Sequence, residues 1–160
     1  GMKIQISLAQ QWLQLLDDDG QLLATWPVAT AERGAGELCG SYCTPRGKHL
    51  IRAKIGAGEP RGTVFSARRP TGEIYSPELA AAFPERDWIL TRILWLSGCE
   101  PGFNRLGNVD TMRRYIYIHG CPDEVPLGIP ASHGCIRMHS DALMALFEQV
   151  PVYTPVEISE

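Results

Sequence analysis

Alternation of apolar and polar residues over short segments constrains the fold of this chain more than any other feature. In residues 3–9, Ile4, Ile6 and Leu8 recur at every second position, which is typical of a half-buried strand. The 160 residues also include 16 Gly and 12 Pro, which interrupt regular elements and favour turns. The pattern therefore predicts many short strands.

Further strands are expected along the rest of the chain. In residues 12–28 an Asp-Asp-Asp-Gly turn separates two apolar runs, which predicts a hairpin. Single strands are expected in residues 48–56, 63–67, 87–98 and 152–158. Residues 87–98 are also compatible with a helix, because periodicity alone does not separate the two in a short apolar run.

One segment near the C-terminus has helical spacing. Leu143, Leu146, Phe147 and Val150 fall at i, i+3, i+4 and i+7, and Ser140 is expected to cap the N-terminus of this helix. Many short strands with one clear C-terminal helix predict a mainly β fold, either a sandwich or a barrel-like domain.

Length and charge limit the class of protein. We expect one domain over residues 2–160, with Gly1 interpreted as the remnant of a removed tag. The net charge of −3 and the lack of a basic run argue against nucleic acid and anionic membrane as partners. Residues 3–16 lack the continuous apolar stretch of a secretory signal. A cytoplasmic protein is expected, or a periplasmic one if a leader has been removed.

The cysteines do not show the paired spacing of a disulfide framework, which also favours the cytoplasm. There are five of them: Cys39, Cys43, Cys99, Cys121 and Cys135. Cys39 and Cys43 are separated by three residues and so do not form the redox motif C-x-x-C. Together with Cys99 they are interpreted as small apolar or loop residues.

Residues 119–135, HGCPDEVPLGIPASHGC, contain His-Gly-Cys twice and permit two interpretations. Zinc favours two His and two Cys, and the segment offers such a set: His119, Cys121, His133 and Cys135. Each His and Cys are separated by one residue, whereas structural zinc sites usually leave two to four. The spacing therefore disfavours a zinc-bearing, non-catalytic binding domain without excluding it, and we expect no metal.

The second interpretation is a cysteine nucleophile with a histidine base. A thiol with a pKa near 8.5 is mostly protonated at neutral pH, and an adjacent imidazolium can lower the pKa to roughly 3.5–7.5. Gly134 leaves the backbone uncrowded, so the amides of Gly134 and Cys135 could point at a developing oxyanion. Alternation in residues 113–120 places two Ile on one face and three polar or aromatic side chains on the other: Tyr115, Tyr117 and His119.

The longer segment 119–138, HGCPDEVPLGIPASHGCIRM, resembles the signature of the L,D-transpeptidase catalytic domain family (YkuD-type). That signature has His-Gly, a loop of about this length, Ser/Thr-His-Gly-Cys, an aliphatic residue, and Asn or Arg. Other segments also resemble the family, so that the likeness covers most of the chain: residues 44–51, 86–98, 114–120 and 150–158. The resemblance implies a β-sandwich of mixed strands and an enzyme that acts on peptidoglycan stem peptides.

The resemblance also implies roles for individual residues. Cys135 matches the nucleophile and His119 the base, and the backbone carbonyl of Gly120 matches the group that orients the imidazole. His133, Gly134 and Cys135 match the turn that supplies the oxyanion donors. We favour a packed, hydrogen-bonded His133 that shapes this turn over one that transfers protons.

Substrate contacts are less clearly indicated. Arg137 lies where the family carries Asn or Arg, and either binds a substrate carboxylate or forms a buried ion pair. Ser132 is expected to bond its own backbone in the turn rather than to act as a catalytic hydroxyl. Tyr117 either lines a substrate groove or simply packs. His49 and His139 are expected to face solvent.

Cys121 departs from the family, which commonly carries Thr after the His-Gly pair. One hypothesis is a reversible disulfide between Cys121 and Cys135 that switches the enzyme off. The alternative, which we favour, is a small residue tolerated in place of Thr.

The implied reaction is attack of the Cys135 thiolate on the carbonyl that joins a diamino acid to a terminal D-Ala, with release of the amine and formation of an acyl-enzyme. Water as acceptor gives an L,D-carboxypeptidase, which we expect for a cytoplasmic protein that trims recycled murein tetrapeptides. A second stem's amine gives a cross-linking transpeptidase, which we expect for an exported one. No cofactor is expected, and carbapenem-type inhibitors are expected to acylate the thiol.

Overall fold

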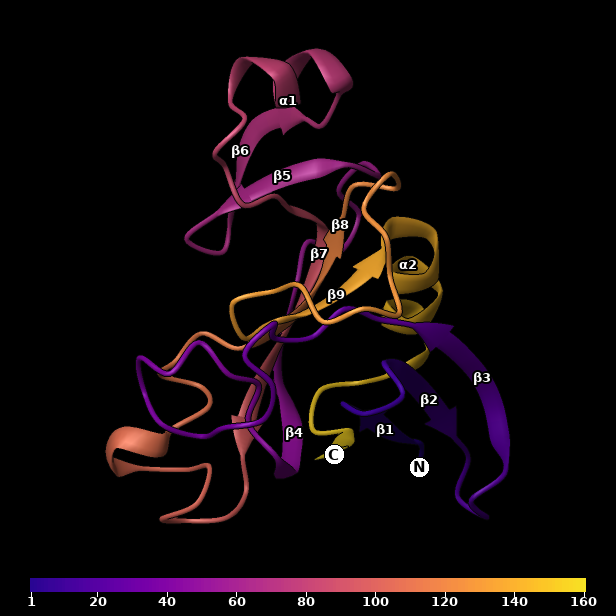
Figure 1. Ribbon diagram of the computed structural model, residues 1–160. Helices are drawn as coiled ribbons and strands as arrows, with labels where there is room; N and C mark the ends of the chain where they lie inside the picture. The colour runs from indigo at the N-terminus through magenta and orange to yellow at the C-terminus, as the bar shows by residue number, and fades with distance from the viewer.

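A computed structural model describes residues 1–160 and contains ten strands, two α-helices and a short 3-10 helix (Figure 1). The strands are β1 (Lys3–Ser7), β2 (Trp12–Leu16), β3 (Leu22–Pro27), β4 (Gly47–Ile55), β5 (Thr63–Ser66), β6 (Arg69–Ile74), β7 (Ile89–Gly98), β8 (Tyr117–Cys121), β9 (Ile136–His139) and β10 (Pro155–Ser159). The helices are α1 (Pro77–Ala82), η1 (Gly107–Val109) and α2 (Ser140–Gln149).

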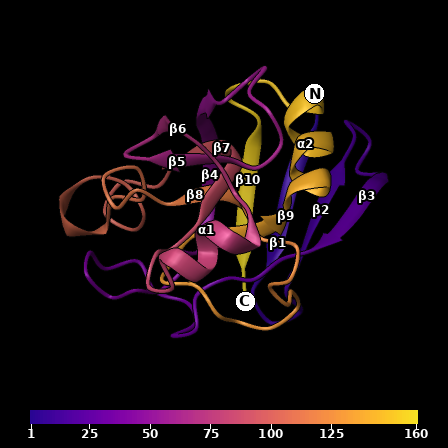
Figure 2. The same cartoon turned by 90° about the horizontal axis from the view of Figure 1, so that it is seen from above.

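All ten strands join one mixed sheet in the order β3-β2-β1-β10-β4-β7-β5-β6, and β8 and β9 extend from β7. Most neighbours are antiparallel, whereas β1 pairs with β10 and β8 with β9 in parallel. The sheet curls, so that α2 lies between the β8–β9 side and the β1–β2 side (Figures 1 and 2). The predicted mainly β fold of mixed strands with a C-terminal helix is confirmed.

The main hydrophobic core lies between α2 and the inner face of the curled sheet. Its 19 buried residues include Ile4 and Ile6 of β1 and Ile118 of β8. The helical stripe predicted from spacing is buried there as well: Leu143, Leu146, Phe147 and Val150. Both apolar periods of the sequence, two and about 3.6, therefore point at one core.

A smaller cluster lies on the opposite face of β7 and β8. It is built around three buried side chains, Phe65, Ile93 and Tyr117. Residues 89–98 are a strand rather than a helix. Successive side chains of this strand point to opposite faces, so that Ile93 joins the smaller cluster and Leu94 joins the main core. Strand β7 therefore separates the main core from the smaller cluster.

Several local expectations were wrong. Strand β8 begins at Tyr117, and Tyr115 lies in the preceding turn with φ +57°. Ser140 is the first residue of α2, and its hydroxyl bonds Thr91 Oγ1 at 2.6 Å instead of capping the helix. His49 is buried rather than exposed, and its Nε2 lies 2.9 Å from Thr111 Oγ1.

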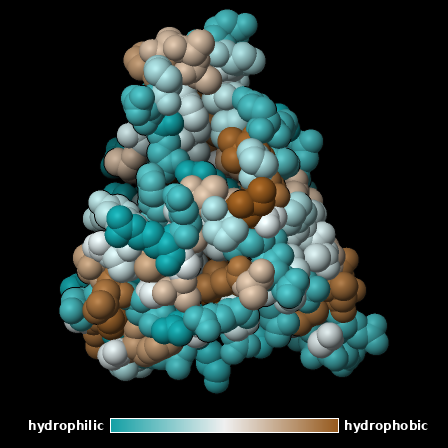
Figure 3. Space-filling model, in the orientation of Figure 1, coloured by the Kyte–Doolittle hydropathy of each residue, from teal (hydrophilic) through white to brown (hydrophobic).

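Four elements were not anticipated: β6, α1, η1 and β9. Each is short, and β9 follows directly on a loop rich in Gly and Pro, so no periodic pattern could develop. Neither α-helix is long and apolar enough to cross a membrane. The face in Figure 3 is mostly hydrophilic, with scattered apolar patches. The single domain expected over residues 2–160 stays a prediction.

Candidate active site

The parallel pair of β8 and β9 places the predicted site residues on one face of the sheet. Ile118 pairs with Ile136, and both belong to the main core. His119 pairs with Arg137, one position along, so these two side chains point to the opposite face. Cys135, one residue before Ile136, shares that face. The structure thus brings His119 and Cys135 together as diagonal neighbours, about 8 Å apart between Cα atoms by ordinary strand spacing.

The thiol of Cys135 packs against the smaller cluster. The residue is half-buried, and Sγ accepts a hydrogen bond from the Tyr117 amide at 3.3 Å. Its S–H is oriented toward the Tyr115 carbonyl oxygen at 3.4 Å. Burial raises the pKa of the Cys135 thiol to about 11, and the Tyr117 amide opposes that rise. The resting residue is therefore a neutral thiol.

His119 is held in one tautomer. Its side chain is buried, and Nδ1 lies 2.8 Å from the carbonyl oxygen of Gly120. Because a carbonyl only accepts, Nδ1 carries the proton and Nε2 is left as an acceptor. Burial lowers the pKa of His119, while the Gly120 carbonyl and Asp87 partly oppose this shift. The imidazole therefore rests neutral, which makes it a base rather than a proton donor.

These two pKa shifts correct one expectation. The sequence suggested an imidazolium that lowers the pKa of the thiol, whereas the structure favours the neutral form of both Cys135 and His119. The physical reason is desolvation, which penalises each charged form in a buried site. Ionisation of the thiol must then coincide with transfer of its proton.

The turn before Cys135 is fixed by hydrogen bonds. Ser132 Oγ donates to the Cys135 carbonyl at 2.6 Å and accepts from the Gly134 amide at 3.2 Å. Thr44 Oγ1 donates to the Gly134 carbonyl at 2.9 Å. Gly134 has φ +132°, and a Cβ there would lie 3.2 Å from the Cys43 carbonyl oxygen. Ser132 therefore shapes the turn as predicted, and only glycine suits position 134.

The expected pair of oxyanion donors is only partly available. The Gly134 amide already bonds Ser132, whereas the Cys135 amide has no partner within the chain. His133 is exposed and packs edge-on against Tyr42, with ring centroids 5.8 Å apart. The favoured interpretation of His133 as a packed, hydrogen-bonded residue is wrong in this respect, since its ring makes no hydrogen bond.

Gly120 allows a close approach between β8 and β7. A Cβ at this position would clash with the backbone carbonyl oxygen of Leu90. No side chain fits without moving that strand, so glycine is required for packing. The same residue supplies the carbonyl that orients His119, which links the strand spacing to the geometry of the base.

The predicted substrate-binding residues have partners in the protein. Arg137 Nη2 forms an ion pair with Asp87 at 3.1 Å, and only 17% of its side chain is exposed. Arg137 therefore forms an ion pair, as one of the two alternatives expected, although its partner Asp87 is exposed and the pair is not buried. Tyr117 is buried, its ring lies edge-on to Trp95, and its hydroxyl accepts a hydrogen bond from Arg68 at 3.0 Å.

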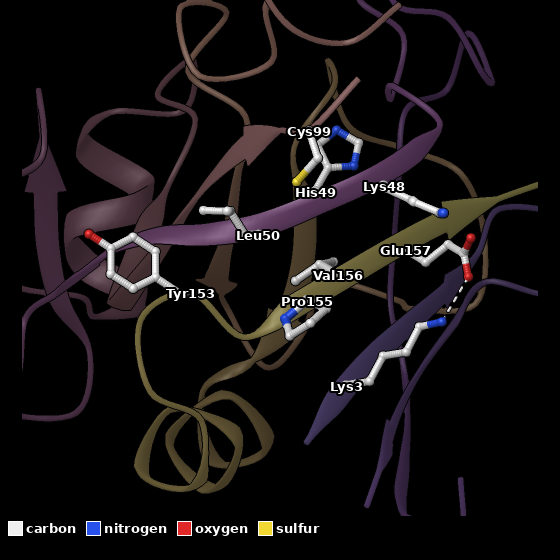
Figure 4. Close-up of a pocket in the computed structure, with 9 residues that line it drawn as sticks. All are labelled: Lys3, Lys48, His49, Leu50, Cys99, Tyr153, Pro155, Val156 and Glu157. Atoms are coloured by element: carbon white, nitrogen blue, oxygen red, sulfur yellow. Dashed lines mark hydrogen bonds and ion pairs between the residues drawn. The ribbon is translucent and has the colours of Figure 1, made fainter. Parts of the chain in front are cut away.

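A cavity of about 290 Å³ opens beside the turn that carries the thiol. Its lining includes Tyr42, Arg113, Tyr115 and His133. A larger cavity of about 430 Å³ lies over β1, β10 and β4, where Lys3 pairs with Glu157 at 3.0 Å (Figure 4). The larger cavity includes none of the predicted site residues, whereas the smaller one includes His133.

The four residues considered as zinc ligands do not converge. His133 is exposed and faces outward. Cys121 lies opposite His139 in the β8–β9 pair, four residues beyond Cys135, so the two cysteines are far apart. No group of three or more His, Cys, Asp or Glu side chains is arranged to hold a metal ion. The hypothesis of a Cys121–Cys135 disulfide is also wrong, because this pairing keeps the two cysteines apart. The two lie more than about 10 Å apart along the strands, whereas a disulfide needs Cα atoms within roughly 7 Å.

Sequence reasoning missed three contributors to the site. Asp87 pairs with Arg137, Thr44 holds the Gly134 carbonyl, and Arg68 bonds Tyr117. Each is at least 49 residues from its partner in sequence, and no local pattern marks such a contact.

A family model for the L,D-transpeptidase catalytic domain (YkuD) matches residues 1–158. The chain belongs to this L,D-transpeptidase family. A Bacillus subtilis (strain 168) protein provisionally named L,D-transpeptidase YqjB is 42% identical over 59 residues, which make up 37% of this chain and 32% of that protein. The family resemblance inferred from the motif is confirmed.

Solved structures of L,D-transpeptidases share the fold. An L,D-transpeptidase from Mycobacterium smegmatis superimposes with a TM-score of 0.61 at 20% identity, over 100% of this chain and 60% of the other. LdtMt1 in complex with imipenem gives a TM-score of 0.57 at 19% identity, over 99% of this chain and 58% of the other. The chain thus spans about three-fifths of the length of these proteins.

Proposed function

We propose that this L,D-transpeptidase family member cleaves the bond between the diamino acid and the terminal D-Ala of peptidoglycan tetrapeptide stems, through an acyl-enzyme on Cys135. One observation carries the proposal. The Cys135 thiol, one residue before β9, lies on the same face as the His119 imidazole of the adjacent strand β8, and the Gly120 carbonyl fixes the imidazole with Nε2 free to accept a proton. A nucleophile paired with an oriented base is the arrangement that acyl transfer requires.

The chemistry starts from neutral groups. Sγ of Cys135 attacks the carbonyl carbon while its proton moves to Nε2 of His119, and the Cys135 amide donates to the developing oxyanion. The imidazolium then protonates the departing amine, the C–N bond breaks, and D-Ala leaves. A thioester on Cys135 remains, and His119 is neutral again.

The acceptor that we propose is water, which makes the protein an L,D-carboxypeptidase that trims soluble tetrapeptides in the cytoplasm. Support comes from the partial exposure of Cys135, which leaves a thioester on its Sγ accessible to water. The second candidate is transfer to the side-chain amine of another stem, which would require an exported protein. It is supported by the family and by the names of its solved relatives.

The test is incubation with purified disaccharide-tetrapeptide, followed by mass spectrometry of the products. Tripeptide with free D-Ala is expected, and a Cys135→Ala variant should release none. A cross-linked dimer would instead identify the transpeptidase. Unchanged tetrapeptide with the wild-type protein would contradict both candidates.

Carbapenems provide an independent probe of the nucleophile. Because the thiol is proposed to accept acyl groups, imipenem should add one adduct mass to the intact protein. The adduct should be absent from Cys135→Ala and present in Cys121→Ala, whose thiol is buried. An adduct on any other residue would contradict the assignment of Cys135.

A further inference from the structure

A guanidinium without an acidic partner lies over the aromatic side chains that flank the thiol. Arg68 is in the tight turn between β5 and β6, where it and Ala67 both have positive φ. Its Cζ lies 4.8 Å from the centroid of the Tyr115 ring and 5.1 Å from that of Trp95. Its one hydrogen bond is donated to the hydroxyl of Tyr117, a neutral acceptor.

The same two tyrosines contact the Cys135 thiol through their backbones. The Tyr115 carbonyl oxygen lies 3.4 Å from Sγ, and the Tyr117 amide lies 3.3 Å from it. Trp95 and Cys135 both pack against the smaller hydrophobic cluster. The aromatic platform under Arg68 is therefore one wall of the space around the nucleophile.

Two other arginines near the thiol are already engaged. Arg137 pairs with Asp87. Arg114 is clamped by three backbone carbonyls and a serine hydroxyl: those of Gly36, Glu37, Cys43 and Ser41. Arg68 has five N–H donors and uses one of them on a phenol. Of these three arginines, Arg68 is the one with most of its donors left for a ligand.

We propose that Arg68 is a specificity-determining residue that binds the free carboxylate of the terminal D-Ala of the substrate. The inference rests on the proposed function. A guanidinium offers two parallel N–H bonds to a carboxylate, and stacking on Tyr115 and Trp95 limits the rotamer entropy lost on binding. The terminal carboxyl carbon lies only about 3–4 Å from the scissile carbonyl carbon, so one residue beside the thiol can bind it.

This arrangement predicts which peptides are cleaved. A stem that ends one residue after the scissile bond presents its carboxylate to Arg68. A stem with an amidated end, or with one more residue, presents a neutral amide there. Since only the charged group gains a bidentate ion pair, the enzyme should prefer tetrapeptides with a free terminus.

The experiment compares disaccharide-tetrapeptide carrying a free C-terminal carboxylate with the same compound carrying a C-terminal amide. We expect wild-type protein to prefer the free acid in kcat/KM. Arg68→Gln should lower kcat/KM for the acid roughly 10- to 100-fold, mainly through KM, and change that for the amide less than about threefold. Arg68→Lys should recover part of the preference, because charge returns without the bidentate fork.

Arg69→Gln is the matched control, since Arg69 is the next residue, at the start of β6, and its exposed side chain makes no hydrogen bond or ion pair. It should behave as wild type with both compounds. Equal losses for acid and amide in Arg68→Gln, or no preference in wild type, would overturn the role of Arg68 while leaving the proposed function intact. If wild-type protein cleaves neither compound, the proposed function fails, and the role of Arg68 fails with it.

Discussion

The two faces of strand β8 contribute to different parts of the molecule, the main core and the candidate active site. On the inner face Ile118 joins a core of 19 buried apolar residues. On the outer face Tyr117 and His119 are equally buried, yet only three side chains form the cluster there. One strand thus contributes both to the scaffold and to the candidate site, through nothing more than alternate side-chain directions.

The difference lies in how polar groups are treated. The inner face of β8 presents Ile118 and Gly120 without a polar side chain, whereas the site on the outer face holds a thiol, an imidazole and a phenol and gives each a hydrogen bond. No buried side-chain nitrogen or oxygen in the structure lacks a partner. Hydrogen bonds therefore offset the cost of burying the polar atoms of the site. Burial of apolar side chains on the inner face stabilises the fold.

Removing the nucleophile should give the largest effect, and it should be confined to activity. Cys135→Ala is expected to lower kcat/KM at least about 10⁴-fold, because the acyl-enzyme cannot form. The free energy of unfolding should change by less than about 1 kcal/mol, since the small outer cluster contributes little apolar burial. Tetrapeptide cleavage and urea unfolding measure the two. A large loss of stability in Cys135→Ala would contradict the view that the inner face stabilises the fold and the outer face carries the site.

Shortening a side chain on the inner face should lower stability and leave activity unchanged. Ile118→Ala is expected to lower the free energy of unfolding by about 2–5 kcal/mol, because it leaves a cavity in the main core. Ile118→Val, the matched control, should cost about 0.5–1.5 kcal/mol. Activity per folded molecule should persist at low temperature. A loss of activity without a loss of stability would mean that the two faces are not separable.

The pH dependence of stability distinguishes two buried histidines. His49 shares the inner face of its strand with Ile51, and burial lowers its pKa to about 4. A depressed pKa means that only the unfolded state binds the proton as pH falls below about 6.5, so stability is lost between about pH 6.5 and 4. The shift corresponds to about 3 kcal/mol.

Replacing His49 by Gln should remove that share of the pH dependence. Urea unfolding of wild type and His49→Gln at pH 7 and pH 4 measures it. The lowered pKa of His119 acts in the same direction in both proteins and therefore cancels from the comparison. Identical pH dependence in the two proteins would contradict the buried, neutral state of His49.

The smallest effect is expected at Cys121. Its thiol is buried at the far end of β8 from Cys135, and burial raises its pKa to about 12. Cys121→Ala should keep activity within about twofold, because the thiolate is the reactive form and it is not populated. On a non-reducing gel, oxidised wild type and Cys121→Ala should migrate alike. A wild-type band whose oxidant-dependent shift vanishes in the variant would restore the disulfide hypothesis.

The strands that carry the site were predictable because their periodicity is local. Ile116 and Ile118 marked the inner face of residues 113–120, and the His-Gly and Ser-His-Gly-Cys segments marked the predicted nucleophile and base. The β9 partner was not predictable, because four residues after a Gly- and Pro-rich loop carry no period.

Long-range contacts were beyond sequence reasoning for a different reason. Arg68 meets Tyr117 across 49 residues, and His49 meets Thr111 across 62. Neither residue type shows from its neighbours whether it will be exposed or buried. That information arises only when the curled sheet brings β4, the β5–β6 turn and β8 into register.

The parallel pairing of β8 with β9 determines how the chain can vary. Parallel neighbours cannot be joined by a tight turn, so residues 122–135 must return along the full length of the pair before β9 begins. Gly128 and Ala131 attach this return path to the segment after β3. Lengthening the loop near the exposed Ile129 would leave the register of the pair untouched, whereas shortening it would pull the thiol away from its base. Insertion into this loop is therefore compatible with the site, whereas deletion is not.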